Sequence, residues 1–332
     1  MQASVIHAFG PAEGTFRSVE LPTPDVTPDQ VLVRVQATSV NPADTGIRSG
    51  ALAAFAAPFP AVLHGDVAGT VEAVGADVTA FQPGDEVFGF VGGVAGFSGA
   101  LAELVAVDHR LLARKPRTAS FTTAGALPLV SITAYLGIIG HGRVQPGQTV
   151  LVYGGAGGVG HLAVQLARIA GGRVFATVAD EAQAAAVRAL GIEDVIFYQT
   201  ETVEAYSARL TGGRGFDVVF DTVGYQNLPI ALQAVAANGT VVTTGIMGPL
   251  DVTPALYKSL TLKVLNTILP LLLNSGRETY GKLLTEVAGW VDAGKVRVLL
   301  DEPVFSFEEV SAAHTRAESG RTIGKVAISR AD

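Results

Sequence analysis

The chain has 332 residues, of which 48% are hydrophobic and 16% are charged. This composition is too apolar for a disordered chain, and the length is enough for two domains, so we expect a folded protein with sizeable cores. The net charge is −7 and the basic residues form no long run, which argues against nucleic acid or an anionic membrane as the partner. We therefore expect a small-molecule partner.

Cysteine is absent, which excludes disulfides, thiolate nucleophiles and cysteine ligands to zinc. The N-terminus lacks the basic segment and apolar core of a signal peptide. The most apolar later run, 268–273, is far shorter than the roughly 20 residues that a spanning helix needs. We expect a cytoplasmic protein with no membrane segment.

Short strands separated by proline, glycine and aspartate are expected from residue 1 to about 125. Apolar and polar side chains alternate in the clearest of them, and the candidate strands are 31–37, 69–75, 86–90 and 102–107. This pattern predicts an antiparallel, barrel-like domain. From 122 to 140, alanine, leucine and isoleucine recur at helical spacing, which predicts a helix.

Strands and helices alternate from Thr149 onward, which is typical of βαβ units on a parallel sheet. The expected strands are 150–153, 173–178, 195–198, 218–221 and 240–244, with a possible edge strand at 260–265. Because an edge strand can pair across a two-fold axis, a homodimer is expected. Further along we expect a helix at 278–293, a capping box at 306–309 and a closing strand at 325–328.

A glycine-rich loop follows the first of these parallel strands and precedes a helix. It consists of Gly154, Gly155, Ala156, Gly157, Gly158, Val159 and Gly160. One of the first two glycines would form the tight turn, Gly157 would let a pyrophosphate approach the backbone, and Gly160 would let the helix lie close to the strand. The helix N-terminus would then bind the phosphates.

Several motifs occur together in an order that resembles the medium-chain dehydrogenase/reductase superfamily, and within it the zinc-independent quinone oxidoreductase branch that includes zeta-crystallin. Besides the glycine loop they are the stretches 41–44, 64–69, 99–103, 126–135, 221–224 and 324–325. The resemblance implies an α/β fold. A GroES-like β-barrel catalytic domain would span 1–125 and 267–332, and a Rossmann domain with a doubly wound parallel sheet would span 126–266.

The residues around His64 bear on zinc. Zinc alcohol dehydrogenases of this superfamily carry a ligand histidine at the position that Gly65 occupies here, with a cysteine upstream. A catalytic zinc needs three protein ligands, and one histidine is not a site. We therefore expect no bound metal and interpret His64 as a turn residue.

The resemblance implies catalytic or pocket roles for three residues after the strand 31–40. Asn41 is either a turn residue or an amide that donates to the substrate carbonyl. Asp44 is either a helix cap or a carboxylate of the pocket wall, and Arg48 is either an exposed arginine or a pocket residue. Gly46 stands where the better-known quinone reductases tend to carry a tyrosine, which argues against quinone as the true substrate.

Cofactor contacts implied by the resemblance lie on strand ends and one helix. Thr133 would contact the nicotinamide carboxamide or bond the preceding helical turn. Two strand ends would line the cofactor, with the residues Val223, Gly224, Gly245 and Ile246. Lys325 would be a solvated lysine or a charge near the cofactor.

The end of the second parallel strand decides between NADPH and NADH. An NAD enzyme usually has an acid there, whereas this chain has Val178. We interpret Asp180 as a helix cap with Gln183 as its reciprocal partner. Gln183 occupies the position of a lysine that grips the 2′-phosphate in NADPH-using relatives, whereas Tyr198 matches a tyrosine of that pocket. The balance favours NADPH, with NADH possible.

Together these features predict hydride transfer from NADPH to a quinone or an α,β-unsaturated carbonyl compound, with the final proton taken from water. A nucleotide-binding scaffold with weak catalysis is the first alternative. A metal-free alcohol dehydrogenase is the second, and it is disfavoured because nothing replaces zinc in stabilising an alkoxide.

Overall fold

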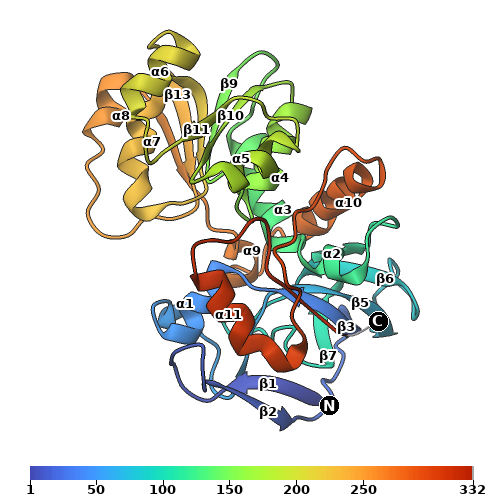
Figure 1. Ribbon diagram of the computed structural model, residues 1–332. Helices are drawn as coiled ribbons and strands as arrows, with labels where there is room; N and C mark the ends of the chain where they lie inside the picture. The colour runs from blue at the N-terminus through green and yellow to red at the C-terminus, as the bar shows by residue number, and fades with distance from the viewer. Residues whose placement is uncertain (331–332) are drawn as a thin grey trace. The chain divides into compact units, whose positions relative to one another are not determined.

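The structure, a computed structural model, describes residues 1–330 and divides into two compact units (Figure 1). Unit 1 comprises Met1–Leu129, Ile268–Gly294 and the chain from Leu300 onward, and unit 2 comprises Val130–Thr267 and Lys295–Leu299. The last two residues of the segment expected at 267–332 lie outside the described part. Within residues 1–330, no helix is long and apolar enough to cross a membrane.

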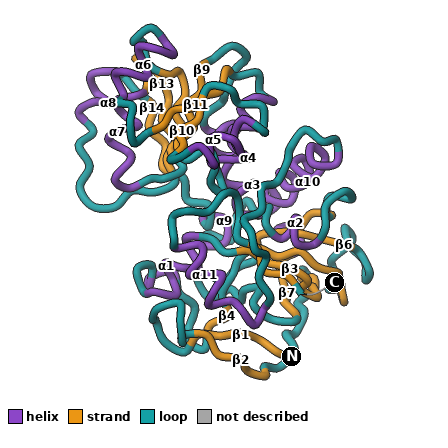
Figure 2. Tube along the Cα trace, viewed as in Figure 1, coloured by secondary structure: helices purple, strands orange, loops and turns teal. Residues whose placement is uncertain are grey.

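Unit 2 is built on a parallel sheet of six strands, in the order β11-β10-β9-β12-β13-β14 (Figure 2). The strands are β9 (Thr149–Tyr153), β10 (Arg173–Val178), β11 (Val195–Phe197), β12 (Phe216–Asp221), β13 (Val235–Thr243) and β14 (Thr261–Val264). The strands are continuous apolar runs because helices cover a parallel sheet, and Leu151, Phe175 and Val219 are fully buried in its core. The expected parallel strands and the edge strand are confirmed.

Helices pack on this sheet between the strands. They are η3 (Leu136–His141), α4 (Gly160–Ile169), α5 (Glu181–Arg188), α6 (Val203–Thr211), η4 (Tyr225–Asn227), α7 (Leu228–Ala234) and α8 (Thr253–Lys258). On α8, Lys258 donates to the carbonyls of Leu232, Gln233 and Val235 and so satisfies the C-terminus of α7.

The helical structure expected at 122–140 is confirmed, but it is divided into three segments. The chain forms α2 (Phe121–Gly125), α3 (Pro128–Tyr135) and the π-helix η3 in succession. Pro128 has no backbone N–H to continue α2, so a new helix starts there. In η3 the Gly142 N–H donates to the Gly137 carbonyl at 3.0 Å, and a Cβ on Gly137 would lie 2.3 Å from the Phe220 ring. The wide turn therefore lets this segment pack directly on β12.

Unit 1 contains two antiparallel sheets. The smaller has the order β2-β1-β4, and the larger has the order β15-β3-β5-β6-β8 with β7 also paired to β3. Their strands are β1 (Gln2–Ile6), β2 (Phe16–Glu20), β3 (Gln30–Ser39), β4 (Ala61–Val62), β5 (Asp66–Val74), β6 (Glu86–Phe90), β7 (Leu104–Asp108), β8 (Leu112–Arg114) and β15 (Ala327–Ser329). Along β3, Val33 and Val35 are buried whereas Arg34 is exposed, as the alternating pattern predicts.

The late segments of the chain return to unit 1 and complete it. They contribute α9 (Leu269–Leu272), α10 (Glu278–Asp292), η5 (Phe307–Glu309), α11 (Val310–Glu318) and β15, and they join the earlier helices α1 (Pro42–Ser49), η1 (Ala53–Phe55) and η2 (His109–Leu111). The expected capping box is confirmed, because the Ser306 N–H donates to Glu309 Oε2 at 2.9 Å. Strand β15 pairs with β3, and α11 lies beside α1 (Figure 1).

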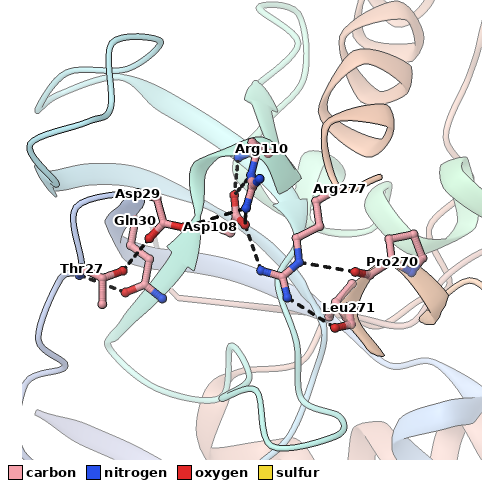
Figure 3. Close-up of polar contacts among 8 residues, drawn as sticks. All are labelled: Thr27, Asp29, Gln30, Asp108, Arg110, Pro270, Leu271 and Arg277. Atoms are coloured by element: carbon pink, nitrogen blue, oxygen red, sulfur yellow. Dashed lines mark hydrogen bonds and ion pairs between the residues drawn. The ribbon is translucent and has the colours of Figure 1, made fainter. Parts of the chain in front are cut away.

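The buried Arg277 at the start of α10 forms an ion pair with Asp108 at the end of β7 (Figure 3). Arg277 donates to Asp108 Oδ2 at 2.9 Å and to the carbonyls of Pro270 and Leu271. Burial opposes ionisation of Asp108, but hydrogen bonds from Arg110 and Arg277 outweigh it and lower the pKa of Asp108 to about 2.

A chain of hydrogen bonds through two buried histidines, His314 and His64, connects α1, α11 and the turn before β5. Arg48 Nε donates to His314 Nδ1 at 3.3 Å, the two Nε2 atoms of His314 and His64 are 2.9 Å apart, and His64 Nδ1 lies 3.4 Å from Thr38 Oγ1. Thr38 donates its hydroxyl hydrogen to the Asp66 carbonyl, so it accepts from His64. The chain of donors therefore runs in one direction and makes His64 the Nδ1–H and His314 the Nε2–H tautomer.

Replacing Arg277 with methionine is expected to lower the free energy of unfolding of unit 1 by about 3 kcal/mol, because it leaves buried acceptors without their donor. Trp290, the only tryptophan, lies on α10, so its fluorescence during urea unfolding measures this unit. Arg34→Met is the control, since the pair of Arg34 with Glu72 is exposed and its loss should cost about 1 kcal/mol or less. Equal losses in the two variants would contradict this account.

Acid is expected to weaken unit 1 through the two histidines. Burial lowers the pKa of His64 well below the ordinary value and that of His314 to about 3. Both are thus neutral when folded, whereas they bind protons below pH about 6.5 when unfolded. Their full contribution is present above pH 6.5 and falls by about 1.4 kcal/mol per pH unit for each histidine as the pH drops toward the folded-state pKa.

The variant His314→Gln isolates this effect, because glutamine can accept from Arg48 and donate to His64 but does not titrate. The difference in unfolding free energy between wild type and variant is expected to shrink by about 1.4 kcal/mol per pH unit between pH 6 and pH 4. Subtraction also removes the opposing contribution of Asp44, whose pKa is raised. A difference that stays constant over this range would refute the assignment of a neutral His314.

Candidate active site

A single carboxylate, Asp66 at the start of β5, organises the polar residues that follow β3. Its Oδ2 atom accepts from Ser39 Oγ at 2.6 Å and from Asn41 Nδ2 at 2.7 Å, and its Oδ1 atom accepts from the Leu129 N–H at 2.7 Å. Lys325 Nζ lies 3.6 Å from Oδ2. Asp66 is fully buried, so this set of donors is what makes its burial tolerable.

Asn41 lies between this acid and a buried lysine. Lys325 Nζ donates to Asn41 Oδ1 at 2.6 Å and to the Val40 carbonyl at 2.8 Å. Lys325 is 3% exposed, and burial lowers its pKa although the nearby Asp66 and Asp44 oppose this. It is therefore not a solvated lysine, and its two hydrogen bonds go to the Asn41 side chain and to the carbonyl of the preceding residue.

Asp44 is the third buried group of this cluster. Its Oδ2 atom accepts from the Asn41 N–H at 2.8 Å, which confirms the helix-cap interpretation for α1. Burial raises the pKa of Asp44 to about 7, with a smaller contribution from the charge of Asp66. Near neutral pH the buried carboxyl group of Asp44 is therefore partly protonated.

Arg48 is not the exposed arginine that is the default for its residue type. It is 1% exposed and bonds Gly10, His314 and Glu318 through all three nitrogens of its guanidinium group. Its length and charge serve to hold α11 against α1, because a buried guanidinium needs acceptors on every side. Arg48 therefore belongs to the hydrogen-bonded chain of His314 and His64. Of the three predicted catalytic residues, only Asn41 and Asp44 are joined by a hydrogen bond that involves a side chain.

The glycine loop of unit 2 follows β9 and ends at the first residue of α4. Gly154 has φ +70, Gly155 would carry a Cβ only 2.5 Å from Ala176 Cβ, and Gly160 would carry one 2.0 Å from the Gly154 carbonyl oxygen. At Gly157 an added Cβ would meet only the Gly154 carbonyl oxygen, at 3.3 Å. Gly154, Gly155 and Gly160 are thus required by the fold, whereas Gly157 has a single close protein neighbour at its Cβ position, which is where a ligand would approach the backbone.

This loop lies where the order of the sheet reverses. From β9 the chain proceeds through β10 and β11 on one side and through β12, β13 and β14 on the other. Ligands of open parallel sheets bind outside the carboxyl ends of the strands at such a point. The exposed apolar side chains at these ends include Tyr198, Val223 and Ile246, at 54%, 53% and 47% exposure.

Hydrogen bonds hold the strand ends around this point in fixed positions. Asp221 accepts from the N–H groups of Val223 and Gly224 and from Thr243 Oγ1. The Tyr225 N–H donates to the Gly245 carbonyl, so the turns after β12 and β13 are joined. This preformed edge, with the free side of Gly157, fits an extended dinucleotide.

The end of β10 has no acid that could accept from a ribose hydroxyl. Val178 is fully buried, and the Tyr198 N–H donates to its carbonyl at 3.3 Å. Asp180 accepts from the Gln183 N–H at 2.9 Å, which confirms it as the cap of α5. The reciprocal bond differs from the expected one, because Gln183 Oε1 accepts from the N–H of Ala179 rather than of Asp180.

Thr133, the remaining predicted cofactor residue, lies on α3 and is 6% exposed. Three residues of unit 1 were missed by sequence reasoning, namely Ser39, Asp66 and His314. Asp66 had a usable signal, since it is an acid at the start of an apolar strand. His314 had none, because its partners are distant in the sequence.

The residues at the expected zinc position do not fit a zinc ion. Gly65 has no side chain to offer, and Nε2 of His64 is hydrogen-bonded to His314. Within the described residues, no group of three or more potential ligands is close enough to hold a metal ion. A zinc site requires three such ligands.

Two protein-family models match the chain. The alcohol dehydrogenase GroES-like domain matches residues 27–117, and the zinc-binding dehydrogenase model matches residues 190–328. The second description names a metal for which this chain lacks the ligands at the expected position. That position, residue 65, lies outside the segment that this model matches.

The chain is 35% identical to 2-methylene-furan-3-one reductase of Solanum lycopersicum, over 92% of this chain and 73% of that protein. It is 32% identical to the chloroplastic NADPH-dependent alkenal/one oxidoreductase of Arabidopsis thaliana, over 99% of this chain and 79% of that protein.

Solved structures agree with these matches. An alcohol dehydrogenase superfamily protein from Novosphingobium aromaticivorans superposes with a TM-score of 0.94 at 40% identity, and each chain is covered completely. A quinone oxidoreductase of Pseudomonas syringae pv. Tomato superposes with a TM-score of 0.87 at 28% identity, with 99% of each chain covered. This chain belongs to the medium-chain dehydrogenase/reductase superfamily, among its quinone and alkenal oxidoreductases.

Proposed function

We propose that this protein is a zinc-independent, NADPH-dependent reductase that transfers a hydride to a quinone or to an α,β-unsaturated carbonyl compound. The observation that carries the proposal is the pairing of two sites in one chain. Unit 2 has a glycine loop at the reversal point of its sheet, and unit 1 has a buried amide, Asn41, held between a lysine and a carboxylate. The names of the two plant relatives support the choice of acceptor.

NADPH would be held by the backbone of the glycine loop and by the strand ends near Tyr198, Val223 and Ile246. The open side of Gly157 and the exposed apolar side chains fit such a ligand. When bound, the cofactor supplies the hydride. The protein contributes binding, orientation and polarisation of the acceptor.

Asn41 is the residue to which we assign polarisation of the acceptor carbonyl. An N–H group of the Asn41 amide that donates to the carbonyl oxygen stabilises the negative charge that develops on this oxygen when the hydride reaches the β-carbon. Asp44, a buried carboxyl group with a pKa of about 7, lies directly beside Asn41 and adjusts the charge of this cluster. Hydride addition at the β-carbon leaves an enolate. Its α-carbon then takes a proton from water, because no side chain of the site is assigned as the acid for this step.

Preference for NADPH rests on the end of β10. An NAD enzyme gains affinity from an acid that accepts from the ribose 2′-hydroxyl. Of the two acids that follow this strand end, Asp180 is occupied as a helix cap and Glu181 pairs with Arg188. Tyr198 lies beside the end of β10, because its N–H donates to the Val178 carbonyl, and its exposed ring suits a 2′-phosphate pocket. The Arabidopsis relative is named for NADPH.

The test is a matrix of NADPH and NADH against several enones and quinones, with cofactor oxidation followed by absorbance. Wild type is expected to oxidise NADPH faster than NADH and to do so without added metal. Asn41→Ala is expected to lower kcat about 100-fold while NADPH binding stays nearly unchanged. Gln165→Ala is the control, because it removes a buried amide that bonds His161 and Arg297 in unit 2.

Unchanged kinetics of Asn41→Ala across the whole panel would reject its role. Binding of NADPH without turnover of any acceptor would instead support a nucleotide-binding scaffold. Oxidation of simple alcohols by the metal-free protein would support an alcohol dehydrogenase.

We also propose a homodimer formed through β14. This strand pairs with β13 on one side, and within residues 1–330 no strand pairs with its other side. Three of its four residues are exposed, and an open strand edge is a template for pairing with a second copy. Light scattering is expected to give twice the mass of one chain, whereas a single-chain mass at micromolar concentration would refute the dimer.

A further inference from the structure

We propose that Lys325 is a positioning residue that fixes the orientation of the Asn41 amide, with Asp66 as its counterpart on the other side. This inference rests on the proposed function, because it explains how Asn41 presents an N–H group to the acceptor carbonyl. It assigns to Lys325 a role in the reaction without contact to the reacting atoms.

The two neighbours of Asn41 determine which way its amide points. A lysine ammonium group only donates, so the Asn41 atom 2.6 Å from Lys325 Nζ must be the oxygen. A carboxylate only accepts, so the atom 2.7 Å from Asp66 Oδ2 must be the nitrogen. Rotating the amide by 180° would place a donor against the lysine and an acceptor against the carboxylate.

The same two charges strengthen the amide as a donor. A cation at Oδ1 draws electron density from the amide, and hydrogen bonds in a chain polarise one another. Asp66 takes one of the two Nδ2 hydrogens. Among the described residues no acceptor is assigned to the second hydrogen, so it is the one available for a ligand.

The backbone holds Lys325 in this position independently of its charge. Gly324 has φ +77, which turns the chain just before the lysine, and the Val40 N–H donates to the Val326 carbonyl at 3.0 Å. The Asp301 N–H donates to the Lys325 carbonyl at 2.9 Å. Backbone hydrogen bonds thus fix the C-terminal segment beside Val40, the residue that precedes Asn41.

The first experiment is a double-mutant cycle of Lys325→Met and Asn41→Ala. If Lys325 acts through Asn41, Lys325→Met lowers kcat about tenfold, and adding it to Asn41→Ala lowers kcat no further. The NADPH dissociation constant, measured by fluorescence, should change less than twofold in every variant. A lysine that only stabilises the fold would leave kcat unchanged, and a lysine that acts independently of Asn41 would give additive losses.

Lys115→Met is the matched control. Lys115 is also a buried lysine of unit 1, with 6% of its side chain exposed, and it bonds the carbonyls of Pro116 and Ala119. Both variants should lower the thermal unfolding temperature, and only Lys325→Met should lower kcat. Equal effects on kcat would overturn the proposal.

The absence of cysteine permits a chemical rescue. Lys325→Cys, alkylated in denaturant with 2-bromoethylamine and refolded, regains an ammonium group at this one position, because the chain has no other thiol. Alkylation with iodoacetamide gives a neutral side chain as the control. Recovery of kcat only with the ammonium group is expected, and equal kcat in both products would overturn the proposal.

The two proposals fail in different ways. If wild type reduces no enone or quinone, the proposed function is wrong. If wild type is active but the cycle is additive, or the NADPH dissociation constant rises with the loss of kcat, only the role of Lys325 is wrong. Should Lys325→Met fail to fold, Asp66→Asn replaces it in the cycle, and the same non-additivity with Asn41→Ala is required.

Discussion

The buried carboxylate of Asp66 is the interaction on which the candidate site depends. A buried charge is costly unless donors surround it, and here a hydroxyl, an amide, the backbone N–H of Leu129 and the ammonium group of Lys325 do so. These donors come from segments that are far apart in the sequence. Satisfying one charge therefore brings together β3, the start of α3 and the returning C-terminal segment.

Unit 2 meets a different constraint, which is to hold the glycine loop in a fixed position at the point where the order of its sheet reverses. Its central strands β9, β10 and β12 are largely buried, and the turns after β12 and β13 are held by Asp221 and by the hydrogen bond between Tyr225 and Gly245. At Gly157 the one protein atom close to an added Cβ would be the Gly154 carbonyl oxygen, at 3.3 Å. Rigid surroundings with one open backbone position are what a preorganised phosphate site requires.

Much of this could be predicted from sequence, because it depends on local pattern. The parallel strands, the glycine loop and the caps at Asp180 and Ser306 all follow from neighbouring residues. The break at Pro128 also had a local signal, which helical spacing across 122–140 obscured. The contacts of Arg48 with His314 and of Lys325 with Asn41 could not be predicted, since these partners lie 266 and 284 residues away in the sequence. Long side chains were expected to be solvated, and burial between distant segments overrode that default.

The most direct test of the proposed hydride transfer follows the hydrogen itself. An enone is reduced with NADPH that carries deuterium at the transferable C4 position, and the product is analysed by mass spectrometry and NMR. The account predicts one deuterium at the β-carbon and a solvent hydrogen at the α-carbon. A product without deuterium at the β-carbon, or NADPH consumption without reduction of the enone, would contradict it.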